Sequence, residues 1–205
     1  MVDEQIAARG VVDARVLAAM RCVPRAEFVD PAQRAHAYDD TPLGIGEEQT
    51  ISQPYIVALM AEALLLRPSD RVLEIGTGCG YAAAVHAELA EEVYTIERHR
   101  CLADAAALRL QALGYARVHA RCGDGTRGWV EAAPFDAISV PAATDVAPQA
   151  VLDQLAIGGR LVIPLGATPA QQELVRITRV SQLAYERVSL GAVRFVPLVG
   201  GPPSP

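Results

Sequence analysis

Aromatic residues are scarce in this 205-residue chain: they make up 5% of it, although 51% of the residues are hydrophobic. A core must therefore be built mainly from Ala, Val, Leu and Ile. No run of Lys or Arg exceeds two residues and the net charge is −6, which argues against a nucleic-acid backbone as the main partner. The chain also lacks a membrane-length apolar run and a basic, then apolar, N-terminal leader. We therefore expect a soluble, cytoplasmic protein with no membrane partner, and a monomer.

The spacings that mark a metal centre or a disulfide framework are also absent. The cysteines are Cys22, Cys79, Cys101 and Cys122, and no two of them form a C-x-x-C pair. The four histidines are scattered along the chain. We therefore expect buried free thiols in a reducing compartment, and no metal site.

The order of the expected elements predicts an α/β fold. Residues 13–23 read as a helix, and a second helix is expected to begin at Ser52, with Pro54 in its first turn. From residue 71 onward strands and helices alternate. The expected strands are 71–76, 92–97, 116–122, 135–140 and 159–166, and the expected helices are 81–90, 100–114 and 148–155. Such alternation is typical of right-handed crossovers and a doubly wound, mostly parallel sheet.

The last part of the chain has a different pattern. Residues 172–180, 183–190 and 193–198 are strand-like with short breaks, so we expect an antiparallel C-terminal end to the sheet. A single domain is the simplest organisation. It would consist of an N-terminal helical layer with a substrate loop (1–65), an α/β core (66–200) and a loose tail (201–205).

A glycine-rich turn, "EIGTGCGY", follows the first strand of this core. Glycines at this position allow a ligand to approach the backbone, and open α/β sheets bind ligands at the carboxyl ends of their strands. Gly76, Gly78 and Gly80 therefore indicate a cofactor pocket. The next strand ends at Glu97, where a carboxylate can accept both hydroxyls of a ribose.

The details of this turn favour S-adenosylmethionine over a dinucleotide. The third glycine comes one position earlier than in the usual dinucleotide motif. Glu74 lies directly before the loop, where a carboxylate would repel a pyrophosphate but attract a sulfonium and an ammonium. Asp124, followed by Gly125 after the third strand, adds an acid suited to the amino group of adenine.

Ser52 lies in a second informative stretch, "GEEQTISQP". One interpretation is that its hydroxyl caps the following helix. The other is that the free N–H groups and the positive dipole of the helix start attract a substrate carboxylate, to which Ser52 adds a hydrogen bond. The residues alone leave both interpretations open.

Seven stretches in a fixed order resemble the protein-L-isoaspartate (D-aspartate) O-methyltransferase family. They are "AYDDTPLGIGEEQTISQPYIVALM", "DRVLEIGTGCGYAAAV", "VYTIER", "GDGT", "APFDAISV", "GGRLVIPLG" and "VRFVPL". The resemblance implies a Rossmann-like class I methyltransferase fold. It also implies methyl transfer from S-adenosylmethionine to the free α-carboxylate of L-isoaspartyl residues in damaged proteins and peptides, the step that initiates their repair, with D-aspartyl residues as an additional candidate.

The resemblance also implies roles for particular residues. Ser52 matches the active-site serine of the family. The positions that match the cofactor site are Glu74, Gly76, Thr77, Gly78, Gly80, Glu97, Asp124 and Gly125. The substrate positions are Thr50, Ser52, Val193, Arg194 and Phe195.

The chain departs from the family pattern at two places, and one rival interpretation follows from them. Glu48 stands where the family usually has glycine, and Pro141 stands where a Thr or Gly is common. Both changes suit a methyltransferase that acts on a small molecule or on ordinary aspartate. A non-catalytic S-adenosylmethionine sensor or adaptor and an NAD enzyme are further alternatives.

Overall fold

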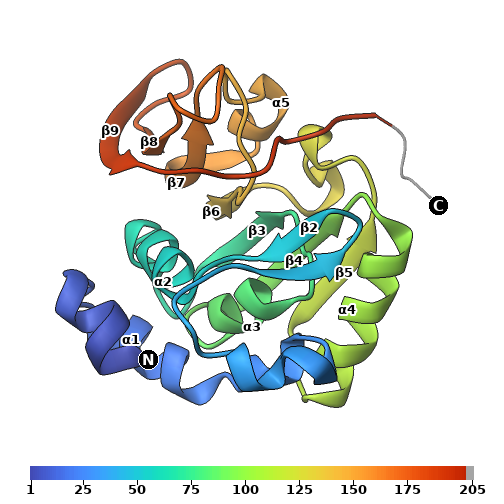
Figure 1. The fold of residues 1–205 in the computed structure, drawn as a ribbon. Coiled ribbons are helices and arrows are strands. Elements are labelled where there is room, and N and C mark those ends of the chain that lie inside the picture. Colours follow the sequence, from blue (N-terminus) through green and yellow to red (C-terminus); the bar gives the residue numbers. More distant parts are fainter. Residues whose placement is uncertain (202–205) are drawn as a thin grey trace.

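The structure is a computed structural model, and it describes residues 1–201. Its centre is a seven-stranded sheet in the order β5-β4-β3-β6-β7-β8-β9 (Figure 1). The strands are β3 (Arg71–Ile75), β4 (Glu92–Glu97), β5 (Val118–Cys122), β6 (Phe135–Ser139), β7 (Leu155–Leu165), β8 (Glu173–Arg179) and β9 (Tyr185–Ala192). The pairs among β3 to β7 are parallel, whereas β8 runs antiparallel to both β7 and β9. The predicted mixed sheet is thus confirmed.

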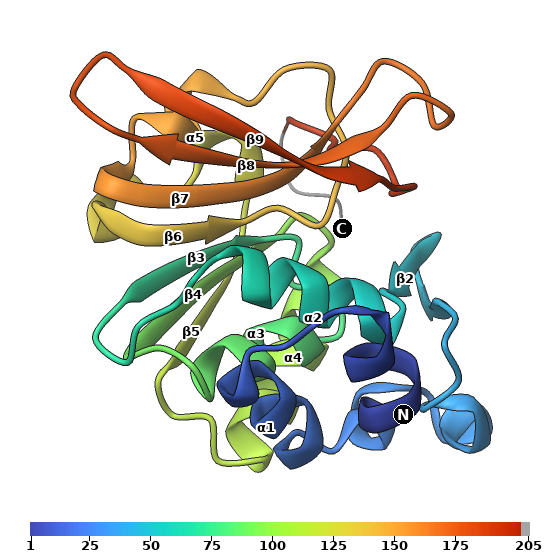
Figure 2. The same cartoon turned by 90° about the vertical axis from the view of Figure 1, so that its left-hand side faces the viewer.

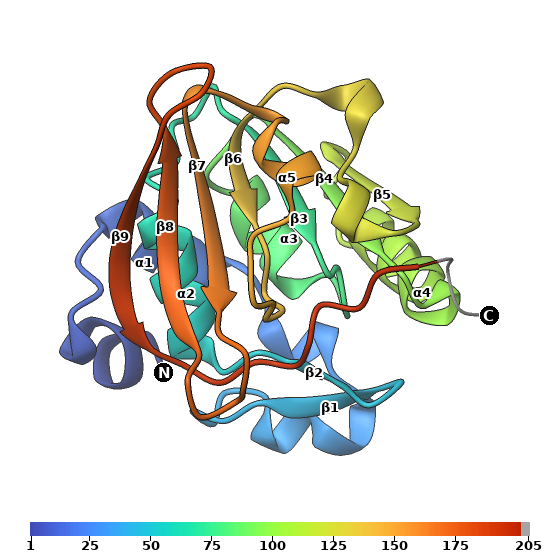
Figure 3. The same ribbon diagram turned by 90° about the horizontal axis from the view of Figure 1, so that it is seen from above.

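Helices cover both faces of this sheet. They are α1 (Ala14–Cys22), α2 (Pro54–Ala63), α3 (Tyr81–Ala87), α4 (Arg100–Ala112) and α5 (Gln149–Leu152). Figure 3 shows α5 on the near face and α1, α2 and α3 behind the sheet, and Figure 2 shows α1 and α2 beside α3. Asp13 caps α1 by accepting a hydrogen bond from the Arg15 amide.

The core is divided by the alternation of side chains along the strands. Val72 belongs to the cluster on the side of α1, α2 and α3, and its neighbour Leu73 belongs to the cluster on the opposite side, with Val151 of α5. Both strand residues are fully buried. A strand buried on both faces requires apolar residues at successive positions, which "VL" in β3 and "AI" in β6 supply.

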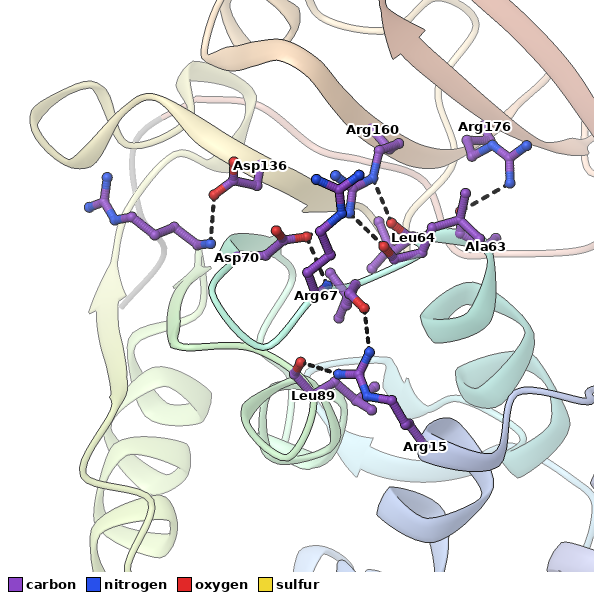
Figure 4. A network of polar contacts seen from close by, with 12 residues as sticks. Arg15, Ala63, Leu64, Arg67, Asp70, Leu89, Asp136, Arg160 and Arg176 are labelled. Atoms are coloured by element: carbon purple, nitrogen blue, oxygen red, sulfur yellow. Dashed lines mark hydrogen bonds and ion pairs between the residues drawn. The ribbon is translucent and has the colours of Figure 1, made fainter.

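Arg160 links the end of α2 to the segment just before β3, as Figure 4 shows. Its guanidinium donates to the carbonyl oxygens of Leu64 and Leu65 and forms an ion pair of 2.6 Å with Asp70. From the N-terminal layer, Arg15 donates to the carbonyls of Leu66 and Leu89. These contacts fix the helical layer against the α/β core.

A small hairpin, not expected from the sequence, precedes α2. Strands β1 (Leu43–Gly46) and β2 (Gln49–Ile51) pair antiparallel around a turn at Glu47 and Glu48. We expected only loop here, because the stretch is rich in Pro, Gly and Asp. Figure 3 shows the hairpin at the edge where the arrows of β3, β6 and β7 end.

Two further expectations were wrong or only partly right, and a third is not tested. Residues 193–198 form no regular strand, because the segment leaves β9 and crosses the strand ends: the Phe195 amide donates to the Gln172 side chain and the Leu198 amide to the Ala143 carbonyl. Cys22 and Cys101 are exposed, although all four thiols are free. The predicted loose tail lies outside the described residues from 202 onward.

Among residues 1–201, no helix has the length and apolar character needed to cross a bilayer. No group of three or more His, Cys, Asp or Glu side chains in the same range is arranged to hold a metal ion.

Candidate active site

A cavity of about 450 Å³ lies at the carboxyl ends of β3, β4 and β6. After β3 the chain adds β4 and β5 on one side and then β6 and β7 on the other, so β3 and β6 flank the switch point where open α/β sheets bind ligands. The lining includes the glycine loop, the hairpin turn and the C-terminal segment 196–199. We call this space the donor cavity.

The glycine loop forms one wall of the donor cavity. The amides of Gly76 and Thr77 both point to the Ile96 carbonyl, which holds the start of the loop against β4. Gly76 has a φ of 106° and Gly78 one of 53°, in the left-handed region that favours glycine. A Cβ on Gly78 would lie 3.1 Å from Ile45 of the hairpin, so a side chain here would also push the hairpin away. Gly80 ends the loop as the N-cap of α3.

Glu97 lies at the end of β4 and lines the donor cavity. One carboxylate oxygen accepts the Gly78 amide at 2.9 Å, and the other accepts the His99 amide at 3.0 Å. These bonds fix the orientation of the carboxylate and leave each oxygen a second lone pair. The carboxylate is therefore a fixed acceptor at the position predicted for the ribose hydroxyls.

Asp124 and Gly125 follow β5. Gly125 lines the donor cavity, and a side chain there would overlap with Ile75. The side chain of Asp124 accepts hydrogen bonds from the Thr126 amide and hydroxyl and, at 2.9 Å, from the Gly201 amide. Burial alone would raise the pKa of Asp124, but these hydrogen bonds outweigh burial and the pKa is lowered. A ligand bound to Asp124 would share its carboxylate with the Gly201 amide of the C-terminal segment.

Glu74 does not line the donor cavity; it lies fully buried beneath the glycine loop. Its Oε2 accepts the hydroxyl of Thr95 at 2.7 Å, and Thr95 is in turn 2.6 Å from the hydroxyl of Thr77, which does line the cavity. Burial raises the pKa of Glu74 to about 8, with a further contribution from the charge of Glu97. At neutral pH the side chain is thus mostly an uncharged acid, and it is linked to the cavity through two threonines.

Ser52 does not cap α2. The helix begins at Pro54, its N-cap residue is Gln53, and no side chain makes a capping hydrogen bond. Of the two interpretations that the sequence left open, capping is therefore wrong. Ser52 precedes the N-cap residue by one position, so its hydroxyl is left available for another role.

Ser52 instead lies between two cavities. It lines the donor cavity and also a second cavity of about 610 Å³, which we call the acceptor groove. Thr50, Pro141 and Val196 are shared in the same way, whereas Arg194 and Phe195 line only the groove. The expected substrate positions therefore come together, except Val193, which lines neither cavity.

Arg25 supports Ser52 from behind and was missed in the sequence. Its side chain is fully buried, donates to the carbonyl oxygens of Ala37 (2.7 Å) and Ser52 (2.8 Å), and stacks on the Tyr81 ring after the glycine loop. Burial lowers the pKa of Arg25. The only signal in the sequence is one arginine among the apolar residues of "VPRAEFV".

The two departures from the family pattern lie at the edges of these cavities. Glu48 is exposed, lines the donor cavity and has a φ of 57°, so it adopts the backbone conformation that favours glycine. Pro141 follows β6 on the boundary of both cavities, and its ring would lie 3.7 Å from a Cβ on Gly76. Neither residue fills the donor cavity.

These features fit S-adenosylmethionine. The cavity has room for a nucleoside, glycines without side chains form one wall, and the Glu97 carboxylate is held in place by backbone amides. Fold and cavity together are those of an S-adenosylmethionine-dependent methyltransferase. More narrowly, the chain belongs to the protein-L-isoaspartate(D-aspartate) O-methyltransferase family, whose model matches residues 1–202.

Individual relatives agree with this assignment. The chain is 59% identical over 200 residues to protein-L-isoaspartate O-methyltransferase of Rhodopseudomonas palustris, covering 98% of this chain and 92% of the relative. It is 56% identical to a second such protein, from Marinobacter nauticus, with coverage of 98% and 91%.

Among solved structures, a protein-L-isoaspartate O-methyltransferase matches with a TM-score of 0.86 and 30% identity, covering 99% of this chain and 67% of the other. A structure from Plasmodium falciparum, described as a candidate protein of the same kind in complex with S-adenosyl-L-homocysteine, matches with a TM-score of 0.84 and 26% identity. Its match covers 97% and 96% of the two chains.

Proposed function

We propose that this chain transfers a methyl group from S-adenosylmethionine to the α-carboxylate of L-isoaspartyl residues, and that the transfer takes place across the boundary at Ser52. The observation that carries the proposal is that Thr50, Ser52 and Val196 line both cavities. A donor in one cavity and a carboxylate in the other meet at these residues.

The chemistry requires orientation and no general base. A carboxylate has an ordinary pKa near 4, so the acceptor oxygen is already ionised at neutral pH. S-adenosylmethionine supplies an electrophilic methyl group next to a sulfonium. Holding the oxygen in line with that methyl group can contribute roughly 7–11 kcal/mol.

Ser52 acts in this proposal as a positioning group for the carboxylate. Its hydroxyl is free of the helix cap, and its backbone is fixed by the Arg25 guanidinium. One hydrogen bond orients the oxygen without strongly stabilising its charge. Stronger stabilisation would slow the reaction, since that charge is lost in the transition state.

The cofactor residues divide into two groups in this proposal. Gly76, Thr77, Gly78, Glu97 and Gly125 border the donor directly, Glu97 with the ribose hydroxyls. Gly80 shapes the start of α3, while Glu74 and Asp124 act through Thr95 and through the segment at Gly201. On the acceptor side, exposed Arg194 attracts carboxylates of the peptide and Phe195 packs against its chain, with Val193 setting the path of this segment.

We also propose that the protein works as a monomer in the cytoplasm. Two exposed free thiols, Cys22 and Cys101, suit a reducing compartment. D-aspartyl residues are a second acceptor in this proposal, because they too present a displaced carboxylate.

The test compares initial rates of methyl ester formation on three matched peptides. One carries isoaspartate, one carries normal aspartate, and one carries isoaspartate with its α-carboxylate replaced by a carboxamide. The proposal predicts ester only on the first peptide. Equal rates on the first two would favour an ordinary carboxyl methyltransferase, and binding of donor without ester on any would favour a non-catalytic sensor.

A further inference from the structure

Two buried polar atoms face each other beneath the donor cavity without a hydrogen-bond partner in residues 1–201. They are Oε1 of Glu74 and Nδ1 of His86, and they lie 4.0 Å apart. Both side chains are almost completely buried. The separation exceeds a hydrogen bond by about 1 Å, so a small rotation of either side chain joins them. Unpaired buried polar atoms are costly, so two of them facing each other call for an explanation.

The pair is connected to the donor cavity in two ways. His86 is in α3, nearly two turns after the glycine loop, and it lines the cavity directly. Glu74 reaches the cavity through the hydroxyls of Thr95 and Thr77. A charge placed in the cavity therefore acts on both members of the pair.

The two groups are uncharged at neutral pH when the cavity holds no cation. Burial raises the pKa of Glu74 to about 8 and lowers that of His86 to about 4. Oε1 and Nδ1 are close enough for an ion pair, but with these pKa values they belong to a neutral acid next to a neutral imidazole. The other titratable groups facing Glu74 are Glu97 from β4 and Cys79 from the glycine loop, and burial raises the pKa of that thiol.

We propose that Glu74 and His86 form a buried proton-exchanging pair that responds to the positive charge of the methyl donor, so that binding of S-adenosylmethionine, unlike binding of S-adenosylhomocysteine, releases a proton. The two ligands share the nucleoside and the amino-acid end and differ by the methyl group and the sulfonium charge. A cation stabilises the ionised form of a nearby acid, and this effect is large in a cavity of low polarity. The inference rests on the donor assigned in the proposed function, and it makes His86 a positioning residue for Glu74.

The imidazole can serve both charge states of the acid. With Glu74 protonated, its carboxyl O–H donates to Nδ1 and the imidazole proton is on Nε2. On ionisation this proton passes to Nδ1, the Nε2 proton leaves to the solvent, and Nδ1–H then donates to the carboxylate. One proton is released in total, and His86 is neutral before and after.

We expect the affinity for S-adenosylmethionine to depend on pH. In the free protein Glu74 is protonated below about pH 8. The cation lowers this pKa, so binding releases a proton in the range between the two values. Affinity for S-adenosylmethionine therefore rises by up to roughly tenfold per pH unit toward pH 8 and levels off above it. S-adenosylhomocysteine lacks the sulfonium and shows a flatter profile.

The experiment is titration calorimetry of both ligands between pH 6 and 9, in two buffers of different ionisation enthalpy. We would compare the wild-type protein with Glu74→Gln, His86→Leu and His86→Gln. The wild type should release close to one proton per S-adenosylmethionine at pH 7, beyond the number that Glu74→Gln releases. His86→Leu should lose most of this release and bind the donor at least tenfold more weakly, with S-adenosylhomocysteine affinity changed less than threefold.

His86→Gln is the matched control, because its amide keeps a donor and an acceptor next to the acid and should restore the proton release. Equal proton release by wild type and Glu74→Gln would overturn this inference but not the donor assignment. The same conclusion would follow if His86→Leu kept the proton release and the donor affinity of the wild type. If neither ligand binds, the donor assignment itself fails and the inference falls with it. No acceptor peptide is present, so the identity of the acceptor does not affect the result.

Discussion

Replacing Glu48 with glycine should stabilise the hairpin that borders the donor cavity. Glu48 has a φ of 57° and follows Glu47, which has a φ of 51°. Two successive residues in the left-handed region form the turn that glycine and asparagine usually provide. A residue with a Cβ costs roughly 1–2 kcal/mol in this conformation. Glycine removes this cost, but its greater conformational freedom in the unfolded chain offsets about 0.5–1 kcal/mol of the gain.

The net gain for Glu48→Gly is therefore about 0.5–1 kcal/mol, or about 1–4 °C in melting temperature for a chain of this size. Glu47 is a less suitable position, because its carboxylate contacts His99 at 3.5 Å and the Cys101 thiol at 3.3 Å. The assay is thermal unfolding, together with amide hydrogen exchange of Gln49 and Thr50 in β2. Exchange should slow in the variant if the turn is strained.

Glu48→Ala is the control, since it removes the same charge and keeps a Cβ. Alanine should leave the melting temperature unchanged, whereas both variants should lower KM for an acidic isoaspartyl peptide by about twofold at low salt, through loss of one exposed like charge. Equal stabilisation by Ala and Gly would refute the argument from backbone strain and assign the effect to charge.

The remaining predictions concern the two cavities. Ser52→Ala should lower kcat for the isoaspartyl peptide at least tenfold with S-adenosylhomocysteine affinity within twofold; loss of donor binding in calorimetry would contradict the role given to Ser52. Asp124→Ala should instead weaken the binding of S-adenosylhomocysteine by about 1–3 kcal/mol and affect kcat little, because it also leaves the Gly201 amide without its acceptor. Arg25→Met should lower kcat and destabilise the fold by about 1–3 kcal/mol in denaturant unfolding, because two carbonyls lose their donor; Arg25→Lys should recover part of both, and an unchanged kcat in Arg25→Met would exclude support of Ser52. Arg194→Gln should raise KM for acidic peptides and leave neutral ones unchanged in steady-state assays.

The strands and the donor cavity were predictable because they depend on local patterns. Successive apolar residues within "RVLEI" and "FDAIS" are typical of buried parallel strands, and the glycines after Ile75 mark the turn. Because parallel strands end at one edge of the sheet, Glu97 and Gly125 had to lie near that turn. This reasoning needs the order of the elements and no side-chain geometry.

The errors occurred where long-range contacts decide the structure. The hairpin at 43–51 has Glu-Glu in its turn, without the Asn-Gly signal, and its pairing is supported by contacts of Ile45 and Glu47 with distant elements. Residues 193–198 alternate like a strand, yet Gln172 and Ala143 hold them across the strand ends. The burial of Arg25 and the facing atoms of Glu74 and His86 depend on packing that sequence spacing does not report.

In the proposed reaction, a substrate carboxylate in the acceptor groove is held by Ser52 and receives the methyl group. The groove is proposed to select isoaspartate. The most direct measurement mixes equal amounts of the isoaspartyl peptide and its normal aspartyl counterpart with the protein and S-adenosylmethionine. Tandem mass spectrometry then locates the ester. We expect one methyl ester, on the α-carboxylate of the isoaspartyl residue and absent from the aspartyl peptide. An ester shared between both peptides, or none in the presence of bound donor, would contradict it.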